Sequence, residues 1–392
     1  MQATRWPAVW AVFAGGLVAG AYIGKIPPAL PVMRDELHLD LVDSGFIATM
    51  FNATGMAVGM AVGVLCDRYG HKRLALAGLA VMVIGGVLGA FAWTYAALLA
   101  SRFVEGVGFI LFSVAAPSLM AAAAEVPRDR AKALSMWSAY MPTGGSIALL
   151  AAPFAIAAVG WRGLWLILAG FAALGFALVA RYAHAPRHGT VASMSLVLES
   201  LVRPANWALA LLFASYVAQW TSVMIWLPTY LVGERSASVG MAGLATALMV
   251  IVNIPGNLAG GWLIAHGVRR GPMAITACAI MSLTSAAMLL PTLPDALRFA
   301  SMLVFSACAG VIPASIFSGV PAHAKTPQHI GTTNGMVMQS SQAGQFFGPI
   351  ALAWLATHFG NWGATLGAML AFAALGALCG WSISVLERRR SH

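Results

Sequence analysis

The stretch "GVLCDRYGHKR", Gly63 to Arg73, follows the second long apolar run, and "GGWLIAHGVRR", Gly260 to Arg270, repeats its pattern in the second half of the chain. Aligned without gaps, the two stretches share their glycines and their terminal basic pair: Gly63 with Gly260, Gly70 with Gly267, and Lys72-Arg73 with Arg269-Arg270. Further along each half, "AVGWRG" (residues 158–163) parallels "HFGNWGA" (residues 358–364). Two related halves are therefore predicted.

The composition around these stretches is that of a membrane protein. The chain has 392 residues, of which 60% are hydrophobic and only 9% are charged, with a mean hydropathy of +0.82. Soluble proteins carry about 25% charged residues, and a spanning helix needs about 20 mostly apolar residues. The apolar runs predict twelve spanning helices: 7–29, 43–65, 74–93, 96–119, 131–158, 160–183, 205–231, 237–264, 272–290, 295–318, 331–356 and 361–386.

The basic residues predict how these spans are oriented. Of the 22 Lys and Arg residues, Lys25 and Arg102 fall well inside spans, four lie at or beyond the span ends on one side (Arg34, Arg162, Arg235 and Arg298), and the remaining sixteen lie at or beyond the span ends on the other. Cytoplasmic loops are enriched in Lys and Arg. We therefore expect a multi-pass protein of a bacterial-type inner membrane with both termini in the cytoplasm. The net charge of +10 then reflects topology, and no nucleic-acid partner is expected.

The longest polar connection, residues 181–206, divides the spans into six and six. We expect a first bundle over residues 1–183, a cytoplasmic linker over 184–204 and a second bundle over 205–392. Apolar residues between Met194 and Leu201 predict a short linker helix on the membrane surface.

The Gly63–Arg73 stretch resembles the G-x-L-x-D-R-x-G-x-[KR]-[KR] loop of the major facilitator superfamily of secondary transporters. "RFVEGVG", residues 102–108, is similar to that family's R-x-x-Q-G-x-G pattern, with Glu105 in place of glutamine. The first half resembles the cyanate/nitroimidazole-type branch. The resemblance implies an all-α membrane protein, with twelve transmembrane helices in two pseudo-symmetric six-helix bundles and a small-molecule site between them. It also implies a monomer without a cofactor.

The resemblance further implies a gate on the cytoplasmic side. Its residues in this chain are Gly63, Asp67, Arg68, Gly70 and Arg73, which would act through charge pairs and through an acid at a helix N-terminus. A basic loop that only sets topology is the alternative, but it leaves Asp67 unexplained. The second copy has Ile264 in place of Asp67, so a charge-based gate would be asymmetric.

Charges inside the spans are the main candidates for function. A lysine or arginine within hydrocarbon costs about 2.5–3.5 kcal/mol on insertion scales, so such residues usually face a cavity or a partner. Lys25 would either face a cavity or extend to the headgroups, and Arg102 would either bind substrate or form a structural pair with Glu105, three residues away. Two cations against one acid leave one positive charge, which favours an anionic substrate. Glu105 is the candidate for proton coupling.

The second half has no charged residue deep within its predicted spans, because Asp295 and Arg298 lie at the beginning of the span 295–318. It offers polar and aromatic groups at helical spacing, which either bind substrate or join helices by hydrogen bonds. The candidate substrate-binding residues there are Tyr216, Gln219, Trp220, Asn253, Gln339 and Gln342, and Tyr140 is added from span five.

The function predicted from these residues is secondary active transport of a small organic or inorganic anion by alternating access. The alternatives are a drug/proton efflux antiporter for apolar or cationic compounds and a non-transporting membrane receptor. Only a fragment of the antiporter signature, "YMPTGG", is present in span five. No catalytic or metal-binding residues are predicted, and we do not expect an enzyme.

Overall fold

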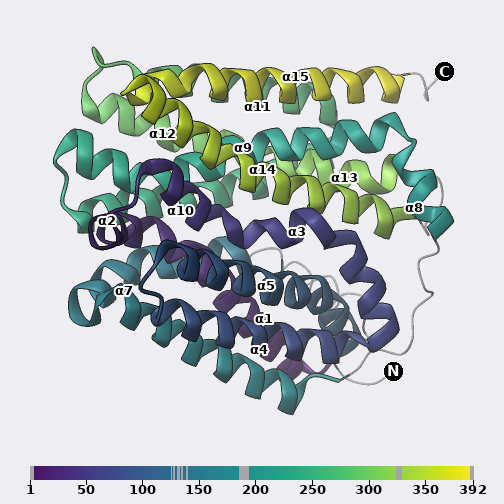
Figure 1. Ribbon diagram of the computed structural model, residues 1–392. Coiled ribbons are helices and arrows are strands. Elements are labelled where there is room, and N and C mark those ends of the chain that lie inside the picture. Colours follow the sequence, from purple (N-terminus) through teal and green to yellow (C-terminus); the bar gives the residue numbers. More distant parts are fainter. Residues whose placement is uncertain are drawn as a thin grey trace. The chain divides into compact units, whose positions relative to one another are not determined.

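The computed structural model describes residues 4–124, 140–184, 194–323 and 329–388, together with the single positions 126, 129, 133, 136 and 137 (Figure 1). Within these ranges, only the backbone is described at residues 60, 63, 64, 67, 194–197, 265, 321 and 329–331. All regular elements of the described chain are helices.

The helices, in chain order, are α1 (Trp6–Gly24), α2 (Ile26–Leu37), α3 (Leu41–Tyr69), α4 (His71–Ala90), α5 (Tyr95–Ala123), α7 (Tyr140–Tyr182), α8 (Met194–Leu201), α9 (Pro204–Arg235), α10 (Val239–Ala265), α11 (Arg270–Leu289), α12 (Asp295–Ala309), α13 (Ile312–His323), α14 (His329–Phe359), the 3₁₀ helix η1 (Trp362–Thr365) and α15 (Leu366–Arg388).

These helices correspond to the twelve predicted spans. Within the described residues, nine helical segments are long and apolar enough to cross a membrane. One of them, α7, contains two predicted spans on either side of Gly160, where the backbone is not helical. The helices α3 and α14 occupy the predicted second and eleventh spans. Spans one and ten differ from the prediction, because each is divided into two helices, α1–α2 and α12–α13.

Glycines with positive φ angles mark the internal repeat in the structure. Among the described residues, four glycines have a positive φ: Gly70 (92°), Gly267 (88°), Gly160 (72°) and Gly360 (68°). They form the two pairs that the sequence alignment predicted, and the angles within each pair agree within 4°. A residue with a Cβ adopts this conformation only at a steric cost. The halves therefore turn the chain at equivalent positions.

Most of the Gly63–Arg73 stretch is helical rather than a loop. Helix α3 continues to Tyr69, Gly70 is the only interruption, and α4 begins at His71. Lys72, in the first turn of α4, donates a hydrogen bond from Nζ to the Ala180 carbonyl near the end of α7 (2.9 Å). The stretch is thus a sharp glycine corner between two spanning helices.

The contacts divide the chain into two compact units. Unit 1 comprises residues 1–191 and 231–247, and unit 2 comprises residues 192–230 and 248–392. In unit 1, α1 packs against α7, and α4 packs against α5 and α7; in unit 2, α11 packs against α12 and α15 (Figure 1). The division at residues 183 and 205 stays a prediction. The predicted linker helix is present as α8.

Glycines bring helix backbones into direct contact within each unit. A Cβ at Gly144 of α7 would meet the Leu17 carbonyl of α1, and a Cβ at Gly344 of α14 would meet the Ala214 carbonyl of α9. Small residues permit such close approaches between membrane helices. Because Gly144 and Gly344 occupy the same place in the two repeats, the close packing is itself repeated.

Candidate functional site

Lys25 lies at a break in the first span. Helix α1 ends at Gly24 and α2 begins at Ile26, and Pro27 and Pro28 follow directly. Proline has no backbone N–H, so the i+4 donors for two carbonyls of the preceding turn are missing. The backbone N–H of Lys25 still donates to Ala21 (2.9 Å). The break places a long cationic side chain inside unit 1.

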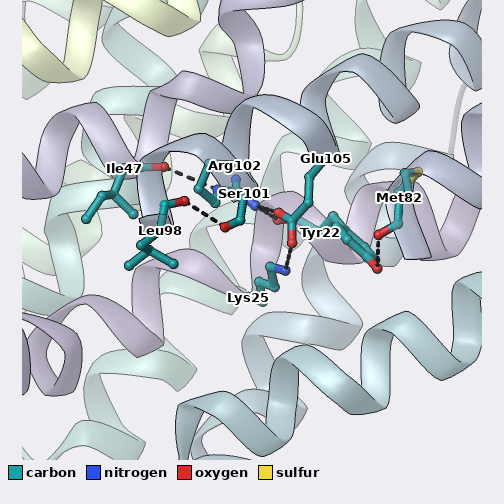
Figure 2. Close-up of polar contacts among 8 residues, drawn as sticks. All are labelled: Tyr22, Lys25, Ile47, Met82, Leu98, Ser101, Arg102 and Glu105. Carbon is teal, nitrogen blue, oxygen red and sulfur yellow. Dashed lines mark hydrogen bonds and ion pairs between the residues drawn. The ribbon is translucent and has the colours of Figure 1, made fainter. Parts of the chain in front are cut away.

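Lys25, Arg102 and Glu105 form one ion cluster, which we call the triad. The Lys25 Nζ lies 2.8 Å from Glu105 Oε1, and the Arg102 guanidinium contacts Glu105 Oε2. Figure 2 shows the two cations reaching the carboxylate from different directions. All three residues are 0% exposed. Lys25 therefore does not extend to the surface of unit 1 in this conformation.

Neighbouring groups hold the two cations in place. Arg102 donates from Nε to the Ile47 carbonyl (3.2 Å) and from Nη1 to the Tyr22 carbonyl (3.4 Å), and it lies over the Phe51 ring (4.8 Å). Lys25 lies over the rings of Tyr22 (4.2 Å) and Trp165 (4.0 Å). Aromatic faces attract cations, most strongly where water is excluded.

Tyr22 and Trp165 were not among the predicted site residues. Tyr22 lies one helical turn before Lys25, and that spacing is a signal in the sequence. It also donates a hydrogen bond to the Met82 carbonyl of α4 (3.0 Å; Figure 2). Trp165 comes from α7, far along the chain, and nothing local in the sequence connects it with Lys25.

The triad carries two positive charges and one negative charge. Removing charges from water is costly unless they are paired and hydrogen-bonded. Glu105 balances one cation, and the surplus positive charge is shared between Lys25 and Arg102. A monovalent anion would neutralise the cluster. The loss of a proton would also do so, and that proton would come from Lys25, because an arginine stays protonated in proteins.

The predicted residues of unit 2 form hydrogen bonds among themselves and with Ser306 of α12. Trp220 donates to Ser306 Oγ (2.9 Å), Ser306 donates to the Met249 carbonyl (2.6 Å), and Asn253 donates to the Ser306 carbonyl (2.8 Å). Ser306, which joins these groups, was not predicted.

Of the other predicted residues, Tyr216 joins the Ser306 cluster through a side-chain hydrogen bond with Asn253, and the rest lie outside the two clusters. Gln219 donates to the Ser215 carbonyl within α9 (3.2 Å), and Gln342 accepts from Gln345 within α14 (3.0 Å). Tyr140 stacks on Trp137, with ring centroids 4.1 Å apart, and is buried. Tyr216 stacks on Phe213 (6.0 Å), and Gln339 is half-buried.

The triad has uncharged counterparts in unit 2. Arg102 bonds to the Ile47 carbonyl of α3, and Ser306 bonds in the same way to the Met249 carbonyl of α10. A Cβ at Gly106 would meet the Phe51 carbonyl, and a Cβ at Gly310 would meet the Asn253 carbonyl. These matched contacts, together with the match of Leu17 with Ala214 at Gly144 and Gly344, set the register. It pairs the members of the triad with residues of unit 2: Lys25 with Ser222, Arg102 with Ser306, and Glu105 with Ala309. The charge is confined to one repeat.

The predicted gate residues surround the corner at Gly70. Arg68, in the last turn of α3, lies over the Tyr69 ring (5.4 Å), and Arg73, in the first turn of α4, is exposed. The side chain of Asp67 lies outside the described part of the chain, and Gly63 is described by its backbone alone. The gating role of the five residues therefore stays a prediction.

A second ion pair of unit 1 is separate from the triad but adjoins its surroundings, because Trp161 packs edge-on against Trp165 (5.4 Å between ring centroids). Glu36 at the end of α2 accepts from Trp161 Nε1 (2.6 Å) and from Arg162, and Arg162 lies over the rings of Trp93 (4.0 Å) and Trp161 (4.2 Å). Partial burial raises the pKa of Glu36, but the hydrogen bonds from Trp161 and Arg162 outweigh burial and hold this pKa below its usual value. We call these four residues the Glu36 clamp.

Comparison with known proteins decides the family. The sequence profile described as Major Facilitator Superfamily matches residues 12–346. The chain belongs to the major facilitator superfamily. That family consists of multi-pass membrane transporters of small molecules rather than enzymes, and the chain has its fold.

Solved major facilitator structures share the fold. A bacterial homologue of the human lysosomal transporter Spinster, in an inward-facing and occupied conformation, has a TM-score of 0.77 at 17% identity, covering 99% of this chain and 98% of the homologue. A D-xylose-proton symporter has a TM-score of 0.74 at 16% identity, covering 96% and 97%.

Curated major facilitator relatives carry several substrates in their names. The nitrite extrusion protein of Bacillus subtilis is 24% identical over 81% of this chain and 79% of the relative. The putative niacin/nicotinamide transporter NiaP of the same organism is 24% identical over 65% and 66%. The methylenomycin A resistance protein of B. subtilis is 28% identical over 39% of this chain, and the chain spans about a third (33%) of that relative's length.

Proposed function

We propose that this major facilitator protein transports a small organic or inorganic anion by alternating access. The observation that carries the proposal is the surplus positive charge of the triad, in which Lys25 and Arg102 share the single carboxylate of Glu105 at 0% exposure. A guanidinium presents a planar fork of donors that matches carboxylates and similar oxyanions. An anion brought to the triad would offset the surplus charge.

Two relatives have names consistent with this substrate class. The nitrite extrusion protein and the niacin/nicotinamide transporter are named for nitrite and for niacin, and both nitrite and nicotinate are small anions at neutral pH. We therefore choose nitrite, nicotinate, acetate and benzoate as probes.

The roles that we assign to the other candidate residues are proposals as well. Substrate contacts are assigned to Tyr140, Tyr216, Gln219, Trp220, Asn253, Gln339 and Gln342. Proton coupling is assigned to Glu105, and gating is assigned to Gly63, Asp67, Arg68, Gly70 and Arg73. We further propose a monomer in a bacterial-type inner membrane with cytoplasmic termini and bundles bounded at residues 183 and 205.

The test is binding followed by transport. The purified protein is screened by thermal shift against the four probes, because a ligand that binds the native state raises its apparent stability. A probe that binds is then followed by uptake into proteoliposomes. Lys25→Met, which keeps length and loses charge, is expected to reduce anion uptake at least tenfold.

The control is Arg162→Met, which removes a cation of unit 1 outside the triad. Uptake by this variant is expected to stay within about twofold of the wild type. Failure of all four probes to bind, or equal uptake by Lys25→Met and the wild type, would refute the anion proposal.

A second candidate is efflux of apolar or cationic compounds. It is supported by the names of the methylenomycin A resistance proteins and of the drug efflux pump JefA of Mycobacterium tuberculosis, which is 25% identical over 36% of this chain. For such cargo, Lys25→Met would leave efflux in cells nearly unchanged. A receptor without transport would bind a probe and show no counterflow in proteoliposomes.

A further inference from the structure

The hydrogen bonds around Ser306 in unit 2 occupy most of the donors that a ligand could use there. The Ser306 hydroxyl donates to the Met249 carbonyl (2.6 Å) and accepts from Trp220 Nε1 (2.9 Å), and Asn253 donates from Nδ2 to the Ser306 carbonyl (2.8 Å). Tyr216 is also hydrogen-bonded to Asn253. Because a hydroxyl group and an indole ring have one polar hydrogen each, Ser306 and Trp220 have no donor left.

Asn257, one helical turn after Asn253 on α10, extends this network. Its Nδ2 lies 2.8 Å from Asn253 Oδ1 and 3.0 Å from the Asn253 carbonyl oxygen. The orientation of the amide is fixed, because a turned amide would place its oxygen against two other acceptors. Both amide hydrogens of Asn257 are thereby used, and no group in the described chain donates to its Oδ1.

The Asn257 side chain lies on a face of α10 that is directed away from lipid. The large exposed apolar side chains of this helix within unit 2 are Leu248, Ile251, Leu258 and Trp262. At 3.6 residues per turn, they lie about 100–180° around the helix from Asn257. Asn257 is half-buried, and Gly261, one turn further on the same face, is exposed with no described neighbour within 4 Å of the position of a Cβ. The Asn257 amide oxygen is therefore accessible to a molecule other than lipid.

A second amide of unit 2 also has an unused oxygen. Gln219 of α9 donates from Nε2 to the Ser215 carbonyl (3.2 Å), which fixes this amide in the same way. Its Oε1 is buried and has no hydrogen-bond partner in the described chain, and a buried acceptor without a donor costs free energy. The amides of Gln342 and Gln345 in α14 bond to each other and not to a backbone carbonyl, so they have no fixed orientation.

The unused atoms determine which chemical group can bind. An amide oxygen accepts a hydrogen from a hydroxyl or amino group, and it repels the oxygens of a carboxylate or of nitrite. We propose that Asn257 is a specificity-determining residue that accepts a hydrogen bond from the transported molecule, and that the substrate is a small anion that also carries a hydrogen-bond donor such as a hydroxyl group. The inference rests on the proposed function, which assigns the negative charge to Lys25 and Arg102, and it narrows the substrate class.

The experiment compares anions that differ only in a donor hydrogen. Thermal-shift titrations of the purified protein compare acetate with glycolate and methoxyacetate, and benzoate with its meta and para hydroxy and methoxy derivatives. The methoxy probes keep the added oxygen but have no hydrogen to donate. We expect at least one hydroxy anion to bind about fivefold to tenfold more tightly than both its parent and its methyl ether, which is the effect of about one hydrogen bond.

Asn257→Leu, which has a similar size and no acceptor, should bind the hydroxy anion and its parent equally tightly. Because the result is a ratio of two affinities of one protein, a general loss of stability does not produce it. Thr246→Val is the matched control, because the Thr246 hydroxyl donates only to the Ala242 carbonyl of the same helix; this variant should keep the wild-type ratio. Asn257→Ala serves if Asn257→Leu does not fold.

The possible failures are distinguishable. Equal binding of the hydroxy anions, their parents and their methyl ethers would overturn the inference and leave the proposed function intact. A hydroxyl preference that Asn257→Leu retains would overturn the assignment to Asn257. If no anion binds but para-hydroxybenzamide, an uncharged probe, binds more tightly than benzamide, the anionic substrate falls and the acceptor role stands. If no probe of either kind binds, the proposed function and the inference both fall.

Discussion

The two ionised carboxylates of unit 1 described above have different environments, and this difference determines what their removal costs. Glu105 is 0% exposed and paired with two cations, whereas 39% of the Glu36 side chain is exposed. Water compensates a surface charge that loses its partner, but it does not reach a buried one.

Glu105→Ala is therefore expected to destabilise the protein strongly. Removal of one partner from a buried ion pair costs about 3–5 kcal/mol, and here two cations would be left without a counter-ion. The measurement is the melting temperature in detergent together with the yield of monodisperse protein. Glu36→Ala, the exposed counterpart, is expected to cost less than about 1 kcal/mol; equal losses for the two variants would contradict burial of the triad.

The Glu36 clamp predicts a pH dependence at acid pH. The folded-state pKa of Glu36 lies below its usual value, so the carboxylate contributes stability above the ordinary glutamate pKa of about 4.3 and loses that contribution as the pH falls through the folded-state pKa. The melting temperature of the wild type should therefore drop between about pH 5 and pH 3. Glu36→Gln should show a smaller drop; parallel curves would exclude the clamp as the cause.

For these individual residues, the sequence predicted the contact within one helix but not the contacts between different helices. The Arg102–Glu105 pair follows from a spacing of three residues on one helix, and the structure contains it. The Lys25–Glu105 pair connects positions 80 residues apart, so it depends on how α1 and α5 pack. Whether Lys25 faced the interior or the headgroups was open for the same reason.

Two neighbouring glycines allow the helix packing to be tested at the scale of elements. A Cβ at Gly144 would collide with the Leu17 carbonyl of α1, whereas a Cβ at Gly145 would lie 3.8 Å from the Gly20 carbonyl, an ordinary contact. The two positions share one helix, one neighbouring helix and the same amino acid.

We expect Gly144→Ala to lower stability by about 1–3 kcal/mol, because α1 and α7 would have to separate. Gly145→Ala should be neutral or slightly stabilising, because alanine favours a helix over glycine by up to about 1 kcal/mol. The melting temperatures of the two variants give the comparison. If Gly145→Ala proved the more harmful, the register of α1 against α7 would be wrong.

Helix breaks were predicted where glycine marks them and missed elsewhere. The corners at Gly70, Gly160, Gly267 and Gly360 follow from the aligned repeats. The breaks within spans one and ten, at Lys25 and after Ala309, lie inside apolar runs that satisfy the length of a spanning helix. Hydropathy shows how long an apolar run is and that lipid surrounds it. It does not show where the helix within that run is interrupted.

For the whole molecule, the distribution of Lys and Arg predicts the orientation of the chain in the membrane. The turn after α11 contains the exposed residue Thr292 on the predicted outer side, and the turn before it contains the exposed residue Val268 on the cytoplasmic side. Both can be replaced by cysteine in a protein whose native cysteines, Cys66, Cys278, Cys308 and Cys379, are changed to alanine.

In intact cells, a membrane-impermeant maleimide is expected to label Thr292→Cys and not Val268→Cys. Permeabilised cells should label both. The reverse pattern would place the termini outside. The number of spans follows mainly from the lengths of the apolar runs, which can be read directly from the sequence. The orientation is inferred from a bias in Lys and Arg, and labelling of this kind measures the orientation itself.

The uncharged counterparts of the triad have a consequence for how charge is distributed between the two repeats. Lys25, Arg102 and Glu105 correspond to Ser222, Ser306 and Ala309, so at these matched positions of the described chain the first repeat carries charged side chains and the second carries small, uncharged ones. A chimaera that joined two copies of the first repeat would contain a second buried ion cluster with its own surplus positive charge, and it would bear the cost of removing such a cluster from water twice.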